Sequence, residues 1–180
     1  NVAGAIKHPE KGKRLDISAD TAKVTGVDDA KVFLYCVDGY GSTQELQNII
    51  NVERPDAIML FTDPRYFVHV FNMEDQIRKQ CPIAYLNIWD DYPAPRYNQA
   101  FYESCDLLMG ISKQTVNINK LVLEDCDNER RVFRYIPHGL DHTHYFPINE
   151  EHEQWDEYQK FRNETLFQNQ KVDFCLFFKY

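Results

Sequence analysis

The sequence predicts an α/β fold built around a mainly parallel β-sheet. Short apolar runs alternate with segments of helical character, which is the pattern of βαβ units. These runs are nearly continuously apolar, as strands are when both faces of a parallel sheet are covered. We therefore expect a Rossmann-like, three-layer αβα domain. Its predicted strands are residues 31–37, 56–62, 82–88, 107–109 and 131–136.

Helix-start signals follow these strands. Ser42 stands three residues before Glu45, a capping box that predicts a helix ending before Pro55. Residues 62–64 (Thr-Asp-Pro) place a proline at the first position of a helix expected to run to about residue 80. Further helices are expected at 16–24, capped by Ser18 or Asp20, and at 96–104, 112–123 and 150–167.

Composition limits the partners and the compartment. The chain of 180 residues has a net charge of -8 and no basic cluster, so it lacks a nucleic-acid footprint. No apolar run approaches the length of a transmembrane segment. Its five cysteines are widely spaced without a Cys-x-x-Cys pair, which predicts free, buried thiols in a reducing compartment. We expect a cytoplasmic protein, and peripheral membrane contact through a local patch stays open.

The pattern changes after the fifth predicted strand. Pro137 ends that strand, Gly139 permits a tight turn, and the connection runs through Asp141 to Pro147. An acidic helical segment follows, and residues 171–178 have the apolar character of a new buried strand. We therefore predict one domain over residues 1–147, and a linker helix with the start of a second domain over residues 148–180.

These stretches resemble the group 1 retaining glycosyltransferases of the GT-B fold. Residues 135–147 are similar to the segment by which that family leaves its N-terminal domain, Ile-Pro-Asn-Gly-Val-Asp and then Phe-x-Pro. Residues 102–115 resemble the family's succession of helix, apolar strand and Ser-initiated helix. Residues 171–178 look like the first strand of its C-terminal domain, so the resemblance runs from about Lys31 to Tyr180.

The resemblance implies the acceptor-binding half of a GT-B enzyme. Such an enzyme transfers a sugar from a nucleotide-sugar donor to a glycan, lipid or small-molecule acceptor, without a cofactor or metal. The family's Glu-x7-Glu element and phosphate-binding Arg/Lys pair belong to the C-terminal domain and match nothing here. Its first strand and glycine-rich loop are not recognisable before Lys31. We therefore expect a fragment that lacks the donor-binding catalytic half and transfers no sugar alone.

Ligands of such sheets bind beyond the carboxyl ends of the strands. The loop after the third predicted strand is the best acceptor surface, because aromatic rings stack on sugars and carboxylates accept their hydroxyl hydrogens. Trp89 and Tyr92 are the expected binding residues there, and Asp90 and Asp91 the catalytic candidates, in place of the His that related enzymes often carry. The alternative is that one aspartate caps the next helix while Trp89 packs.

Other strand ends supply further candidates, each with a structural alternative. Asp38, Tyr40 and Gly41 could line the cleft or form a tight turn. At Asp63, contact with the acceptor or a metal competes with helix capping. Ser112 and Lys113 lie at a helix N-terminus that suits a phosphate or carboxylate, and capping is the alternative for Ser112. The remaining candidates, for the donor or the domain interface, are His138, Gly139 and Asp141.

The sequence permits three other interpretations. His138, His142 and His144 with Asp141 could suggest a metal cluster, but their short loop spacing matches no catalytic metal motif. A dinucleotide oxidoreductase is disfavoured because no Gly-x-Gly-x-x-Gly follows a strand. The alternative to the transferase is a non-catalytic Rossmann-like domain that binds a carbohydrate or a protein.

Overall fold

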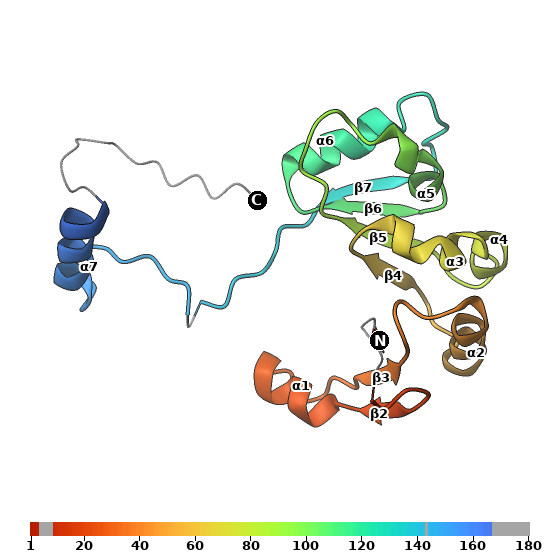
Figure 1. The fold of residues 1–180 in the computed structure, drawn as a ribbon, viewed down its shortest axis with the longest axis horizontal. Coiled ribbons are helices and arrows are strands. Elements are labelled where there is room, and N and C mark those ends of the chain that lie inside the picture. Colours follow the sequence, from red (N-terminus) through yellow and green to blue (C-terminus); the bar gives the residue numbers. More distant parts are fainter. Residues whose placement is uncertain (4–8, 143, 167–180) are drawn as a thin grey trace. The chain divides into compact units, whose positions relative to one another are not determined.

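The computed structural model describes residues 1–3, 9–142 and 144–166 (Figure 1). The chain divides into two compact units, Asn1–Ile136 and Pro137–Tyr180. The first unit confirms the predicted α/β, Rossmann-like fold, with a four-stranded parallel sheet flanked by helices. The sequence prediction placed a domain boundary at residue 147, and that assignment stays a prediction.

The parallel sheet has the order β4-β5-β6-β7. Its strands are β4 (Ile58–Phe61), β5 (Ile83–Asn87), β6 (Leu107–Gly110) and β7 (Val132–Tyr135). The register of the four strands aligns one residue from each on the same face of the sheet, where they pack in the core: Leu60, Tyr85, Leu108 and Phe133. The opposite face is more open, since it carries Met59 with 61% of its surface exposed.

The helices begin largely where the sequence predicts. Ser42 caps α2 (Thr43–Glu53), because its hydroxyl accepts a hydrogen bond from the Glu45 N–H at 3.3 Å. Ser112 caps α6 (Lys113–Val122) in the same way, and α6 packs on β6 and β7 (Figure 1). Between β5 and β6 lie a 3-10 turn, Arg96–Asn98, and α5 (Gln99–Glu103).

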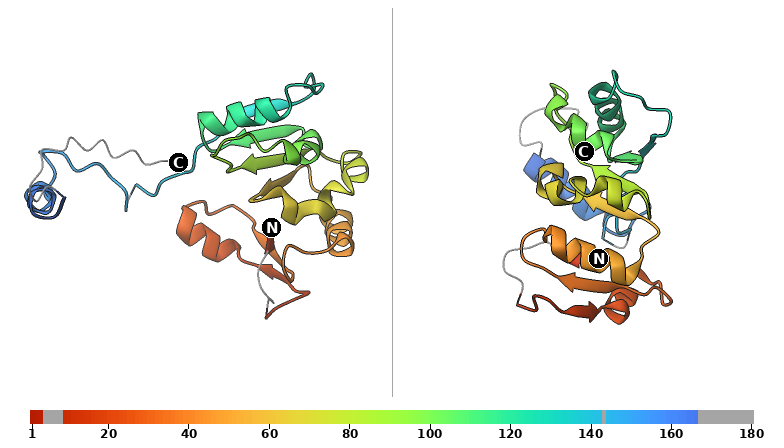
Figure 2. Two further views of the ribbon diagram at one scale, coloured as in Figure 1. Left: turned by 45° about the horizontal axis from the view of Figure 1, so that its top comes forward. Right: turned by 90° about the vertical axis from the view of Figure 1, so that its right-hand side faces the viewer.

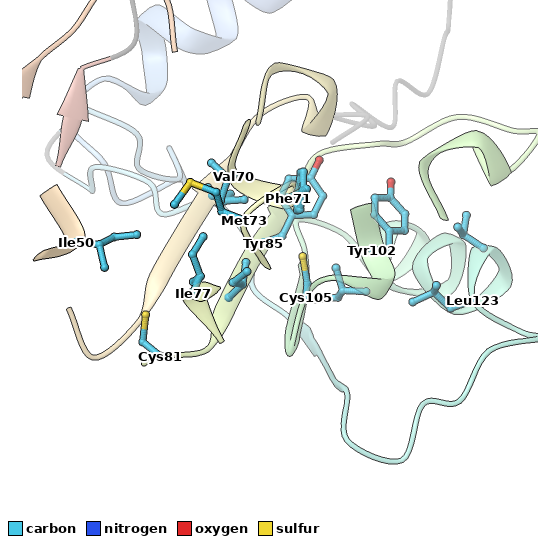
Figure 3. Close-up of a cluster of buried hydrophobic side chains, with 14 of the residues drawn as sticks. Ile50, Val70, Phe71, Met73, Ile77, Cys81, Tyr85, Tyr102, Cys105 and Leu123 are labelled. Atoms are coloured by element: carbon cyan, nitrogen blue, oxygen red, sulfur yellow. The ribbon is translucent and has the colours of Figure 1, made fainter. Parts of the chain in front are cut away.

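The predicted continuous helix over residues 65–80 is wrong. The segment is a 3-10 turn, Pro64–Phe67, followed by α3 (Val68–Phe71) and α4 (Glu74–Ile77). The break after Phe71 lets Met73, Phe71 and Ile77 all enter the core (Figure 3). A single uninterrupted helix would not turn these side chains to one face, since they do not follow its period.

The first predicted strand belongs to a separate sheet. β3 (Phe33–Cys36) pairs in parallel with β1 (Val2–Ala3) and antiparallel with β2 (Arg14–Asp16). Its side chains are mostly half-buried rather than buried, and the Arg14 guanidinium lies 3.5 Å from the centre of the Phe33 ring. α1 (Ser18–Thr25) follows β2 without a side-chain cap, so the predicted caps at Ser18 and Asp20 are wrong.

The core contains the predicted free thiols. Cys36, Cys81 and Cys105 are buried and Cys126 is partly buried, all four without a disulfide, whereas Cys175 lies outside the described residues. Burial raises the pKa of the Cys105 thiol above its ordinary value. These thiols therefore pack as apolar groups in this unit.

The second unit is mostly loop followed by helix. α7 (Trp155–Phe161) continues into a π-helical turn, Arg162–Leu166, and is shorter than the predicted helix of residues 150–167. The predicted strand at residues 171–178 lies outside the described residues. Within the described ranges, no helix combines the length and apolar character that a bilayer crossing needs.

Candidate functional site

Hydrogen bonds between side chains and main-chain groups hold the loop after β5 in place. The Trp89 indole Nε1 donates to the Asp91 carbonyl at 2.7 Å, and the Gln114 amide donates to the Asp90 carbonyl at 2.8 Å. The Tyr92 N–H donates to the Asp91 carboxylate at 2.8 Å. Neither aspartate caps the following 3-10 turn, whose N-cap is Pro95, so the capping part of the alternative is wrong. Its other part is confirmed, because Trp89 is partly buried and packs against the core.

The Asp90 carboxylate faces solvent. It has no hydrogen-bond or ion-pair partner in the part of the chain that the structure describes, and the residue is exposed. Of the two predicted catalytic carboxylates, Asp90 is therefore open to a ligand hydroxyl, whereas Asp91 is engaged with the loop backbone.

A buried amide network supports this loop from below. Asn87, the last residue of β5, is 2% exposed and donates from Nδ2 to the Tyr102 hydroxyl at 2.9 Å and to Asn119 Oδ1 at 2.6 Å. Its Oδ1 accepts from the Trp89 N–H at 3.0 Å. The network thus joins β5, α5 and α6 to Trp89 of the loop. The sequence analysis did not predict this network. The polar residue Asn87 at the end of an apolar strand was the feature that could have indicated it.

Four aromatic rings, which we call the aromatic rim, gather at the strand ends: Tyr40, Tyr66, Trp89 and Tyr97. Tyr40 and Tyr66 stack with ring centres 4.5 Å apart, and Trp89 meets Tyr97 edge to face at 6.1 Å. Tyr66 is 53% exposed and Tyr97 63%. The sequence prediction had named Tyr40 and Trp89 but missed their two partners, which only spatial pairing identifies.

An ion pair lies near one tyrosine of each aromatic pair. Arg65 and Asp63 form a bidentate contact, with Arg65 Nε 2.9 and 3.1 Å from the two Asp63 oxygens. Arg65 lies near enough to both Tyr97 and Tyr66 for each to raise its pKa, although Asp63 is the main cause. The Arg65 guanidinium in turn lowers the pKa of Asp63. Asp63 also caps the 3-10 turn, since its carboxylate accepts from the Arg65 N–H.

The residue that precedes this pair has an unusual backbone. Thr62 follows the last residue of β4 and has φ of 90°, a value that is uncommon for a β-branched residue. The Tyr85 hydroxyl donates to the Thr62 carbonyl at 2.8 Å and holds it there. Strained residues of this kind cluster at functional sites.

The remaining predicted residues of the first unit have mainly structural contacts. Asp38 forms an ion pair with Lys11 at 2.7 Å, and its carbonyl accepts from the Gly41 N–H in a turn that Gly41 enters at φ of 82°. Ser112 caps α6, and its hydroxyl lies 2.9 Å from that of Thr115. Lys113 is exposed at the first position of α6.

The three predicted donor-side residues lie in the second unit. His138, Gly139 and Asp141 are exposed, and the Asp141 carboxylate lies 2.8 Å from Nδ1 of His144. In the described ranges, no three His, Cys, Asp or Glu side chains come together as a metal site would require.

Comparison of the chain with protein-family models, curated proteins and solved structures finds no match.

Proposed function

We propose that the chain is the acceptor-binding part of a nucleotide-sugar-dependent retaining glycosyltransferase, and that the aromatic rim binds a sugar of the acceptor. The observation that carries this proposal is the pairing of exposed rings with a carboxylate and a guanidinium at the carboxyl ends of the strands. Ligand sites of open α/β sheets occur at this edge.

The chemistry of the rim suits a pyranose ring. The apolar face of a sugar stacks on the face of an aromatic ring, as Tyr66 and Tyr97 offer with more than half of their surface exposed. Hydroxyls at the edge of the sugar would donate to Asp90 and Asp63 and accept from Arg65. In this proposal Asp90 accepts the proton of the acceptor hydroxyl, and Asp91 shapes the loop.

Preorganisation supports the same proposal. The loop is fixed by backbone hydrogen bonds and by Asn87, so little ordering is needed when a sugar binds. Donor binding is assigned to a separate C-terminal domain, as in the family that the sequence resembles. We therefore expect the 180-residue chain to bind an acceptor but not to turn over a nucleotide-sugar.

One observation favours a second candidate, a non-catalytic carbohydrate-binding domain. No described side chain orients the Asp90 carboxylate, whereas a general base is normally positioned by a partner. Both candidates require sugar binding at the rim. They differ in the expected effect of Asp90→Asn. If the chain is part of a transferase, this substitution abolishes sugar transfer in the presence of the donor domain.

Saturation-transfer NMR with a panel of methyl hexopyranosides and oligosaccharides tests the shared step. We expect binding with Kd in the millimolar range, weakened roughly 2–13-fold by Tyr66→Ala or Tyr97→Ala, because one stacking contact contributes about 0.5–1.5 kcal/mol. Tyr145→Ala, which removes an exposed tyrosine of the second unit, is the matched control. Equal affinity in all four proteins, or no binding to any sugar, would contradict the proposal.

A further inference from the structure

The Asp91 side chain is held in position beside the aromatic rim. Its carbonyl accepts from the Trp89 indole Nε1 at 2.7 Å, so the residue is joined to one ring of the rim. Its carboxylate Oδ1 accepts from the Tyr92 N–H at 2.8 Å, which orients the carboxylate. The other oxygen, Oδ2, has no hydrogen-bond or ion-pair partner among the residues that the structure describes. Asp91 is exposed, so this oxygen is available to a ligand.

The same loop brings an open ring close to this carboxylate. β5 lies between β4 and β6, so the loop that carries Asp91 starts from an inner strand of the sheet (Figures 1 and 2). The Trp89 ring, whose N–H bonds to Asp91, meets the Tyr97 ring at 6.1 Å. Tyr97 is 63% exposed. A sugar that stacks on Tyr97 therefore has the Asp91 carboxylate at the edge of its ring.

The basic side chains on the loops of the rim are already paired. Arg65 forms an ion pair with Asp63. Arg96 forms one with Glu124 and also lies 3.9 Å from Asp125. Neither guanidinium therefore adds an uncompensated positive charge beside the rim.

The two successive loop aspartates keep their negative charges uncompensated. In the described ranges no ion pair joins Asp90 or Asp91 to Lys113 or to another basic side chain. A ligand carboxylate or phosphate would add a third negative charge here, whereas an ammonium group forms charge-assisted hydrogen bonds with a carboxylate. Aromatic ring faces also attract cations, and an indole does so most strongly. The charges of the site thus favour a cationic sugar over a neutral or an anionic one.

We propose that the sugar bound at the aromatic rim is a hexosamine with a free, protonated amino group, and that Asp91 Oδ2 accepts hydrogen bonds from this ammonium. Asp90 stays available to the acceptor hydroxyl. The inference rests on the proposed function, because it names the class of sugar that the rim binds. The amine of such a sugar carries its charge near neutral pH, since its pKa is close to that of an α-amino group, about 8.

NMR titrations followed by the Trp89 indole signal test the proposal with three probes at about pH 6.5 and low salt. The probes are methyl β-glucosaminide, its N-acetyl derivative, which keeps the nitrogen without the charge, and methyl β-glucoside. We expect the Kd of the glucosaminide to be about fivefold lower than that of either neutral sugar, as one exposed charge pair with a cation–π contact gives. This preference should fall below about twofold in about 0.5 M NaCl, because salt screens exposed charges.

Two matched variants assign the preference to a residue. Asp91→Asn keeps a side-chain oxygen for the Tyr92 N–H and removes the charge, so the preference for the amine should fall below about twofold. Asp28→Asn makes the same change in net charge at an exposed position between α1 and β3, and should keep the preference of about fivefold.

Each outcome bears on the proposal. Equal affinity of the unchanged chain for the three sugars would overturn the inference and leave sugar binding at the rim intact, whereas no binding to any sugar would overturn both. A preference that survives in Asp91→Asn would place the amine elsewhere. A preference lost equally in Asp28→Asn would assign it to the net charge of -8 rather than to the site. An equal shift of the Trp89 signal by ethylammonium alone would show that no sugar ring is recognised, and would also overturn the inference.

Discussion

Replacing Asn87 by alanine removes the amide that joins three elements beneath the candidate loop. The substitution leaves the Trp89 N–H, the Tyr102 hydroxyl and Asn119 Oδ1 without the partners they have at 3.0, 2.9 and 2.6 Å. A buried polar group that loses its partner costs about 1–3 kcal/mol, whereas a typical hydrogen bond contributes about 1 kcal/mol net. For three such contacts we expect a loss of about 3 kcal/mol in the free energy of unfolding.

Urea unfolding followed by circular dichroism measures this loss. With a slope of about 1.5 kcal/mol per molar urea, the midpoint of Asn87→Ala should fall by about 2 M. Asn48→Ala is the matched control, because Asn48 is exposed on α2 and its side chain accepts a hydrogen bond from Gln44 on the same helix, so its midpoint should change by less than about 0.3 M. Equal midpoints for the two variants would refute the claim that the network supports the loop.

Three further predictions concern the same strand ends. Thr62→Gly should raise the free energy of unfolding by about 0.5–1 kcal/mol in urea melts, because glycine adopts the φ of 90° without strain; a loss of 1 kcal/mol would contradict this. Asp63→Asn should lower the melting temperature at pH 7 but not at pH 2. The lowered pKa of the Asp63 carboxyl stabilises the fold above the ordinary carboxyl pKa, and this stabilisation is lost as the pH falls through the lowered pKa. A decrease in melting temperature that does not depend on pH would show that the ion pair does not cause it. Burial raises the pKa of Tyr102 to about 12, so this phenol should lower the stability by about 1.4 kcal/mol per pH unit from about pH 10, where the unfolded phenol ionises, toward pH 12. Burial also raises the pKa of Tyr85, so the whole decline is steeper. Tyr102→Phe should show a shallower decline than the unchanged chain, and an identical one would assign the effect to other groups.

Local signals in the sequence were sufficient for much of the fold. The caps at Ser42, Ser112 and Asp63 depend on residues two or three positions away, and the structure confirms all three. The strands β4 to β7 were predicted from uninterrupted apolar runs, which depend on burial alone. Short-range chemistry of this kind can be recognised without knowing the tertiary structure.

Long-range pairing accounts for what the sequence did not predict. An apolar run cannot indicate which strand it pairs with, and β3 pairs with the short strands β1 and β2 that carry almost no apolar signal. The partners Asn87 and Asn119 are 32 positions apart. Tyr40 and Tyr66 likewise come from different sheet ends and were brought together only by the fold.

The indole N–H signals of the two tryptophans test the central claim most directly. Trp89 lies in the aromatic rim and Trp155 begins α7 in the second unit, so one protein contains both the probe and its control. In ¹H–¹⁵N spectra recorded during a titration with a hexopyranoside acceptor, we predict a saturable shift of the Trp89 indole signal while that of Trp155 stays in place. A Trp89 signal that does not move at sugar concentrations of tens of millimolar, or equal shifts of both signals, would contradict sugar binding at the rim.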